Sequence, residues 1–323
     1  MSTAAAPART SPVERVGRPI AGPRERAGDR FFRLTVTGFA GLILLAAFAL
    51  AWQLTRGSLQ TWKAFGFSFL TKSVWDPVAN DFGALPFLYG TVVSSLIALL
   101  IAVPLGVGSA VFLAELAPRR VSDAVSFAVE LLAAVPSVIL GLMGVFVLVP
   151  AVRACEPFLS RWLGFLPLFR GAPYGIGLLS AGLILSLMIL PYITSITREV
   201  LLAVPRSLKE GMYALGATRW EMVRAVSLPY ARSGIFGAAF LALGRALGET
   251  MAVTMVIGNT PQISASLFNP AYSMAAVIAN ELAEAAGDKH LSALIAIGLV
   301  LFAVTIVVNG AARLLIYKVE GRK

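Results

Sequence analysis

An arginine and a glutamate stand four residues apart in an otherwise apolar stretch late in the sequence. The segment reads GRALGET at residues 244–250, and long apolar runs flank it on both sides. Residues four apart lie on the same face of a helix, one turn from each other. An arginine at the centre of a membrane-spanning helix costs roughly 2.5–3.5 kcal/mol on insertion scales, so such residues face the bundle interior and are functional by default.

Two interpretations of this pair stay open on the residues alone. Arg245 and Glu249 could neutralise each other and hold helices together. Alternatively, the Arg245 guanidinium could offer a planar fork of donors to a tetrahedral oxyanion in transit, with Glu249 holding the fork in place. Gly244 and Gly248 form a G-x-x-x-G pattern, which predicts that another helix approaches closely beside the pair.

The composition is that of an integral membrane protein. Of the 323 residues, 58% are hydrophobic and 14% are charged, whereas soluble domains carry about 25% charged residues. With one cysteine and one histidine, an internal disulfide and multi-histidine metal sites are excluded, and no nucleophile–base pair indicates an enzyme. The apolar runs are long enough to cross a bilayer, and they predict six spans, near residues 34–54, 87–115, 124–150, 173–197, 233–258 and 291–316.

The basic residues predict the orientation of these spans. The two termini and the loops at 116–123 and 198–232 hold 19 lysines and arginines, and the opposite side holds 7. The positive-inside rule then places both termini in the cytoplasm, so the charge indicates a membrane surface and not nucleic acid. We expect a basic, disordered tail over residues 1–33, a transmembrane domain over 34–317 and a short cytoplasmic tail over 318–323. We also expect the first span to be retained, because the tail before it is too long for a signal peptide.

Two smaller features lie in a predicted span and in an outer loop. Glu130 is the other charge within a predicted span, and we expect it to pair with an arginine of a neighbouring helix. The outer segment 259–290 contains an apolar and acidic pattern that predicts an amphipathic helix near residues 272–286.

The longest cytoplasmic loop, about residues 199–231, carries signals for two short helices. Ser207 and Thr218 each precede a glutamate by three residues, as in a capping box. Gly216 stands between them, where a helix end in the left-handed conformation favours glycine. Pro229 predicts that the second helix ends just before it. Helices this short need a cover for their apolar residues, and periodicity alone leaves open whether their own bundle or a groove on a cytoplasmic partner supplies it.

This loop resembles the EAA coupling loop of ABC-importer permeases. Gly211 and Met212 stand where that family often has two alanines, but the spacing of the glutamate, glycine and proline is kept. The resemblance implies that the loop inserts into a cleft on a separate ATPase subunit. The sequence has no Gly-Lys dipeptide, so this chain cannot itself supply a Walker A phosphate-binding loop. The residues that match the motif are Glu210, Leu215, Gly216, Ala217, Trp220, Leu228 and Pro229.

The wider sequence resembles the C-type permeases of phosphate-specific transport systems. The resemblance covers the chain from about residue 30 to the end, and it implies an all-α membrane fold of the type I, MetI-like kind, with six transmembrane helices and cytoplasmic coupling helices. It also implies that Arg245 and Glu249 take part in phosphate passage. The stretches that carry it are LGRALGETMAVTMVIGN, LLAAVPSVILGLMG, LPYITSITREVLLAVP and SLFNPAYSMAAVIANELAEA.

The same resemblance implies a set of partners at the inner membrane of a bacterium. They are an A-type permease that forms a heterodimer with this chain, two ATPase subunits that hold ATP and magnesium, and an extracytoplasmic phosphate-binding protein that docks on outer loops, including residues 259–290. The chain itself would bind no cofactor. Two alternatives remain: a permease for another oxyanion, such as sulfate, molybdate or a phosphonate, and a stand-alone secondary transporter that needs no ATPase.

Overall fold

The computed structural model describes residues 27–285 and 287–320. The chain divides into two units, Met1–Leu50 and Ala51–Lys323. In the first unit, the described residues form the beginning of helix α1 (Ala27–Phe65), which is apolar and long enough to cross a membrane. Helix α1 begins ahead of the predicted start at residue 34. The rest of the predicted tail, residues 1–26, lies outside the described residues, as do residues 321–323 of the predicted C-terminal tail.

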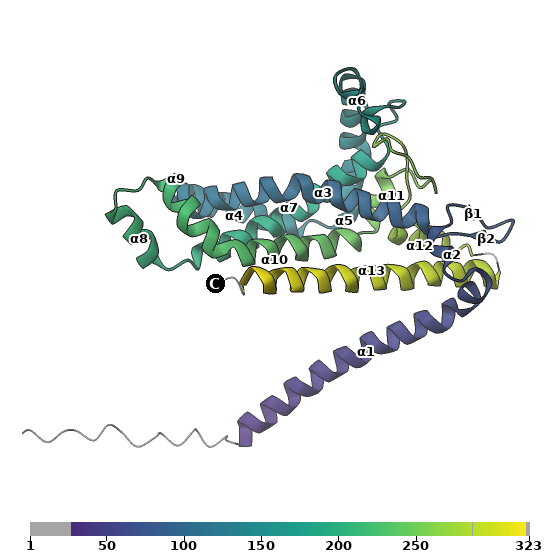
Figure 1. Cartoon of the computed structure of the whole chain (residues 1–323), viewed down its shortest axis with the longest axis horizontal. Coiled ribbons are helices and arrows are strands. Elements are labelled where there is room, and N and C mark those ends of the chain that lie inside the picture. The colour runs from purple at the N-terminus through teal and green to yellow at the C-terminus, as the bar shows by residue number, and fades with distance from the viewer. Residues whose placement is uncertain (1–26, 286, 321–323) are drawn as a thin grey trace, which may run out of the picture. The chain divides into compact units, whose positions relative to one another are not determined.

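In its described residues, the second unit is mostly helical and contains one short hairpin (Figure 1). Three of its helical segments are π-helical (η1, η2 and η4) and one is a 3₁₀ turn (η3). After the end of α1, the elements are α2 (Ser68–Thr71), β1 (Trp75–Asp76), β2 (Asp81–Phe82), α3 (Leu85–Val111), η1 (Phe112–Leu116), α4 (Arg119–Ala134), α5 (Ser137–Met143), η2 (Gly144–Leu148), α6 (Val149–Leu163), η3 (Pro167–Phe169), α7 (Leu178–Leu202), α8 (Arg206–Ala214), α9 (Arg219–Met222), η4 (Val223–Ser227), α10 (Leu228–Leu247), α11 (Met251–Val256), α12 (Met274–Glu281) and α13 (Asp288–Glu320).

The structure confirms six apolar helices. Within the described part of the chain, six helical stretches have the length and composition needed to cross a membrane. The second, fourth and sixth predicted spans agree with the structure to within about five residues. The first, third and fifth need correction, and the first runs on to Phe65 instead of ending near residue 54. The six stretches are Gly28–Phe65, Leu85–Leu116, Ser137–Leu163, Leu178–Leu202, Arg219–Leu247 and Asp288–Tyr317.

The third span lies later in the chain than the prediction of residues 124–150. Helix α4 ends at Ala134, and Val135 is extended before Pro136. A proline disfavours the helical conformation of the residue before it, which separates α4 from α5. The spanning stretch then runs through α5, η2 and α6 to Leu163. The amphipathic segment 119–134 is therefore a separate helix packed against α7.

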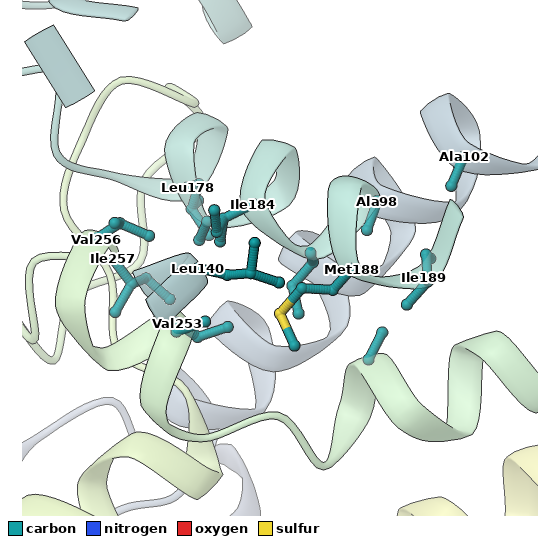
Figure 2. Packing of buried hydrophobic residues seen from close by; sticks show 14 of the residues in the cluster. Ala98, Ala102, Leu140, Leu178, Ile184, Met188, Ile189, Val253, Val256 and Ile257 are labelled. Atoms are coloured by element: carbon teal, nitrogen blue, oxygen red, sulfur yellow. The ribbon is translucent and has the colours of Figure 1, made fainter. Parts of the chain in front are cut away.

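The core of the second unit surrounds α7, the most buried of the long helices. Helices α3, α4, α10 and α11 all pack against it. Figure 2 shows Ile184 and Met188 of α7 among apolar side chains from α5 and α11, with Leu140 between them and Val253. Burial of these side chains fixes the arrangement of the helices that carry both candidate sites.

Helices α3 and α7 pack so closely that a glycine is needed between them. A Cβ atom at Gly182 would lie 2.4 Å from the Cγ2 atom of Ile97. We therefore expect Gly182→Ala to lower the stability of the isolated chain in detergent by about 1–3 kcal/mol through overpacking, measured by thermal unfolding. Gly108→Ala on α3 is the matched control, because nothing lies within 4 Å of its Cβ position. A Gly182→Ala chain as stable as that control would contradict the close packing.

A cap of aromatic residues closes the end of the bundle that lies away from α8 and α9 (Figure 1). Trp75 of β1 pairs with Phe82 of antiparallel β2. The Trp75 indole N–H donates to Glu281 Oε2 at 2.9 Å, and His290 Nε2 lies 3.1 Å from the same oxygen. The buried His290 ring stacks on Phe82 with 5.5 Å between centroids. These contacts join the hairpin, α12 and the start of α13.

The predicted amphipathic helix near residues 272–286 is present as the shorter helix α12. The Ser273 hydroxyl accepts a hydrogen bond from the Ala276 N–H and caps its start. Just before it, burial raises the pKa of Tyr272 to about 12. The Tyr272 hydroxyl therefore stays protonated at any physiological pH, and it accepts a hydrogen bond from the Asn280 amide at 3.0 Å.

Candidate functional site

Arg245 and Glu249 do not lie within one continuous helix. Helix α10 ends at Leu247, Gly248 follows as its C-cap, and α11 begins only at Met251. The prediction of an unbroken span over residues 233–258 is therefore wrong. Gly248 is a poor helix former, and the Glu249 carboxylate lies near the start of α11, where its Oε1 atom is 3.4 Å from the Ala252 N–H. Arg245 thus occupies the last turn of α10 and Glu249 the break.

The partner of Arg245 is an aromatic ring and not Glu249. The guanidinium carbon lies 4.5 Å from the centroid of the Tyr192 ring on α7, in a cation–π contact. Among the described residues, no carboxylate forms an ion pair with Arg245. The Arg245 side chain is exposed on this chain, and Glu249 is partly buried. The structure therefore contradicts the expected salt bridge between Arg245 and Glu249 and leaves the guanidinium donors uncommitted to an acid.

The fifth apolar stretch ends at Leu247, so irregular backbone directly follows the turn that carries Arg245. Within a membrane, the unpaired backbone groups of a broken helix are tolerated only where protein buries them or where they line a water-filled cavity. The Thr250 carbonyl near the break accepts both the Thr254 N–H at 2.9 Å and the Thr254 hydroxyl at 2.7 Å. Gly248, by contrast, is exposed on this chain. Arg245 therefore stands beside irregular backbone that calls for a cavity or a partner chain.

Within the described residues of this chain, no helix makes the predicted close approach at Gly244 and Gly248. A Cβ atom at Gly244 would lie 3.8 Å from the Asn309 side chain of α13, an ordinary van der Waals distance, and Gly248 meets only its own helix. The tight contact of α10 lies nearer its beginning, where a Cβ atom at Gly234 would lie 2.6 Å from Val200 of α7. The closest glycine approach of α10 therefore lies in its first half, while Ala242, Ala246 and Leu247 bury the end that carries Arg245.

Glu130 does not pair with an arginine among the described residues. It is exposed on α4, outside the third span, because that span begins only at Ser137. Arg198 of α7 lines the same small cavity as Glu130, but its guanidinium binds the neighbouring Glu199 at 3.2 Å. The position of Glu130 thus follows from the break at Pro136, which removes the reason to expect a counter-ion.

The coupling loop contains the predicted sharp turn. Helix α8 ends in a Schellman arrangement, with the Ala217 N–H donating to the Met212 carbonyl at 3.1 Å. Gly216 has a φ of 82° at this turn, which is why glycine stands there. The capping box at Thr218 is confirmed, because Thr218 Oγ1 accepts from the Glu221 N–H at 3.3 Å and the Thr218 N–H donates to Glu221 Oε2 at 2.8 Å.

Two of the local predictions for this loop are wrong. Helix α8 begins at Arg206 after an extended Pro205, so Ser207 lies inside the first turn and caps nothing. The second helix also does not end before Pro229: α9, η4 and α10 form one helical stretch from Arg219 to Leu247. Pro229 stands in the first turn of α10, directly after the π segment, where a missing N–H is tolerated. The second helix of the loop thus continues without interruption into the fifth span.

The apolar residues of the coupling loop divide between two faces. Met222 and Val223 are buried against Leu201 of α7 in a cluster with the end of α3. Leu215 and Trp220 instead are 84% and 58% exposed. The bundle therefore covers one face of the loop, and the other face presents large apolar side chains with no cover on this chain. Glu210 and Pro229 are exposed, Leu228 and Ala217 are partly buried, and all these motif residues lie at one end of the bundle (Figure 1).

Two contacts around these sites could not be predicted from the sequence. Tyr192 holds Arg245, but no spacing pattern connects an aromatic residue in the fourth span with an arginine in the fifth. Glu115 binds Lys209 of α8 from the end of the second span. In the sequence, the Ala117-Pro118 pair after Glu115 indicates only that a helix ends there. It does not indicate which residue Glu115 binds.

Comparisons with known proteins give relatives that match most of this chain. Residues 102–321 match the family described as binding-protein-dependent transport system inner membrane component. The phosphate transport system permease protein PstC of Mesorhizobium japonicum is 50% identical over 299 residues, 91% of each chain. PstC of Xylella fastidiosa is 47% identical over 305 residues, 93% of this chain and 94% of the other. PstC of Pasteurella multocida is 47% identical over 303 residues, 91% of this chain and 94% of the other.

A solved structure supports the fold of this chain, and only the fold. The inward-facing MetNI methionine ABC transporter contains a chain that superposes with a TM-score of 0.50 and 22% sequence identity, over 73% of this chain and 94% of the other. That likeness concerns the arrangement of helices only. Together with the relatives that match nine-tenths of the sequence, these findings show that the chain belongs to the PstC family of phosphate transport system permeases.

Proposed function

We propose that this chain is the transmembrane permease subunit of an ABC importer that carries inorganic phosphate across the bacterial inner membrane. The observation that carries the proposal is the 46–50% identity to PstC permeases over about nine-tenths of the chain. The family match over residues 102–321 includes both the coupling loop and residues 244–250. Transport is by alternating access, and ATP hydrolysis on partner subunits drives it. The chain is a transport subunit and not itself the ATPase.

Arg245 is the proposed contact with phosphate in the pathway. Its guanidinium is exposed on this chain, lies over Tyr192 and has no acidic partner among the described residues. Arginine stays charged and presents parallel N–H donors that match two oxygens of a tetrahedral oxyanion. Glu249 lies within the break, and its negative charge opposes tight anion binding. We propose that this opposition favours release of phosphate during the cycle.

The exposed position of Arg245 supports a second permease subunit as a partner. A charge at membrane depth faces a protein interior or a water-filled cavity and not lipid. An A-type permease packed beside α10 would close such a cavity and form the heterodimer. The break after α10 supports the same arrangement, because its backbone groups need protein or water around them.

The coupling loop supports the remaining partners. Its uncovered face around Leu215 and Trp220 has the chemistry of an anchor that enters an apolar pocket. We propose that two ATPase subunits receive this loop and its counterpart on the second permease, and that ATP and magnesium are held on those subunits. Both termini then lie in the cytoplasm, and the aromatic cap with α12 lies outside, where an extracytoplasmic phosphate-binding protein docks. This chain binds no cofactor.

Competition between anions tests the substrate. The assembled transporter with its binding protein is placed in proteoliposomes, and ATP-dependent uptake of labelled phosphate is measured. We expect unlabelled phosphate to compete in full, and sulfate, molybdate and a phosphonate to compete weakly at ten-fold excess. Equal competition by sulfate or molybdate would favour a permease for another oxyanion. Uptake that persists without ATP or the ATPase subunits would favour a stand-alone secondary transporter.

A further inference from the structure

A buried carboxylate joins the coupling loop to the end of the second span. Glu115 lies in η1, directly after α3, and its side chain is only 5% exposed. Its Oε1 atom lies 2.8 Å from Lys209 Nζ of α8. The same atom accepts a hydrogen bond from the Ser227 hydroxyl of η4 at 2.8 Å. One carboxylate oxygen therefore holds both arms of the coupling loop, on either side of the turn at Gly216.

Lys209 adds a third attachment. Its ammonium group also donates to the Leu201 carbonyl at the end of α7 at 3.3 Å, and its side chain is 17% exposed. Helix α8 follows α7 in the chain, but Glu115 is 94 residues from Lys209 and 112 from Ser227. The two bonds to Glu115 are therefore direct connections from the coupling loop to α3 that do not run through α7 and the link before α8.

Apolar contacts surround this polar junction but cannot replace it. Ala110 and Val111 of α3 pack with Met222, Val223 and Leu201 in one buried cluster. Apolar burial is non-directional, so such surfaces hold together while they slide. Charge-assisted hydrogen bonds, by contrast, fix which atoms meet. A buried ion pair is weak evidence for added stability. Its contribution here is to fix the position of the coupling loop relative to the end of α3.

The backbone at the junction is unusual on both sides. Glu115 lies in the π segment η1, and Ser227 is the last residue of the π segment η4. π-helical segments are rare and often occur at functional sites. Here the two π segments present the acceptor and one of its donors to each other.

We propose that Glu115, Lys209 and Ser227 form a clasp that makes the coupling loop and the end of α3 move as one body when the ATPase subunits close. Lys209 and Ser227 are positioning residues on the loop, and Glu115 is the positioning residue on the span. This inference rests on the proposed function, because it assigns the route by which motion of the loop reaches the helices of the pathway.

The decisive quantity is the amount of phosphate transported per ATP hydrolysed by assembled transporter in proteoliposomes. We expect Lys209→Met to lower this ratio about five-fold or more, as for the loss of a coupling between sites, while ATPase subunits still co-purify. Lys209→Arg keeps a cation and should restore most of the ratio. A merely structural role would lower the yield of complex but leave the ratio per assembled complex unchanged, and that result would overturn the clasp.

A double-mutant comparison sharpens the test. Glu115→Gln keeps the shape of the side chain but removes its charge, and we expect it to lower the ratio in the same direction. Because the two residues act as one unit, the double variant Glu115→Gln with Lys209→Met should be little worse than Lys209→Met alone. Fully additive losses would contradict the clasp. Asp123→Asn, an exposed acid on α4, is the matched control and should leave the ratio unchanged.

A second measurement tests the clasp separately from transport. Hydrogen exchange of the α8 amides in the detergent-solubilised chain should be faster in Glu115→Gln than in Asp123→Asn, because α8 loses its charged attachment. Equal exchange in both variants would overturn the clasp, whether or not the transporter carries phosphate. If the wild-type complex shows no ATP-dependent phosphate uptake but α8 is protected by Glu115, the proposed function fails and the contact itself stands.

Discussion

Arg245→Ala is expected to reduce ATP-dependent phosphate uptake by about 10- to 100-fold while the transporter still assembles, as for the loss of a hydrogen bond to a charged group. The reason is local. The guanidinium is exposed at the end of α10, has no acidic partner among the described residues and lies over the Tyr192 ring. Since no salt bridge to Glu249 holds the helices together, removal of the charge should not by itself disrupt packing. Uptake and complex recovery are measured on the same preparations.

Two variants serve as controls for this prediction. Arg245→Lys keeps the charge but lacks the planar fork, so we expect intermediate uptake. Tyr192→Phe keeps the ring face beneath the guanidinium and should transport nearly as well as wild type. Normal uptake by Arg245→Ala would remove Arg245 from the phosphate pathway. Loss of assembly in that variant would instead assign Arg245 to the contact with the second permease.

Trp220→Asp is expected to prevent stable attachment of the ATPase subunits. Trp220 is 58% exposed beside Leu215 on the uncovered face of the coupling loop. Truncation of a tryptophan anchor at an interface costs about 2 kcal/mol or more, which corresponds to a loss of about 30-fold in affinity. An aspartate adds a charge that the partner would have to desolvate. Recovery of ATPase subunits by co-purification, together with ATP-dependent uptake, checks the result.

The control for this variant is Trp220→Phe, which keeps an apolar aromatic side chain and should retain most of the attachment. The capping box of Thr218 and Glu221 lies beside Trp220, so hydrogen exchange of the α9 amides should confirm that the turn is intact in Trp220→Asp. An intact complex with unchanged ATPase activity in that variant would show that this face does not dock.

The two faces of the coupling loop predict separable defects. Variants on the uncovered face, around Leu215 and Trp220, should lose the ATPase subunits. Variants of the clasp, at Lys209 and Glu115, should keep those subunits but transport less phosphate per ATP. A loop that only packed against its own bundle would show neither pattern, since its variants would lower the yield of folded chain alone.

Several features of the protein followed from the sequence by itself. Six apolar runs predicted the six long helices, because a segment of about 20 apolar residues has a strong preference for the membrane. The turn at Gly216 and the capping box at Thr218 were also predictable, since each depends on residues no more than five apart. The likeness of the coupling loop to that of ABC-importer permeases, and of the stretch around residues 244–250 to phosphate permeases, indicated the family.

The tertiary structure alone decided how the charged residues are used. The break after Leu247 places Glu249 beyond the helix that carries Arg245, whereas the spacing of the two residues suggested a salt bridge. Tyr192 and Glu115 reach their partners only because α7 packs beside α10 and because α3 ends beside α8. Hydropathy and capping signals act over a few residues of one segment. The partners of a charged side chain depend on which helices the burial of apolar surface brings together, and a single sequence does not state that.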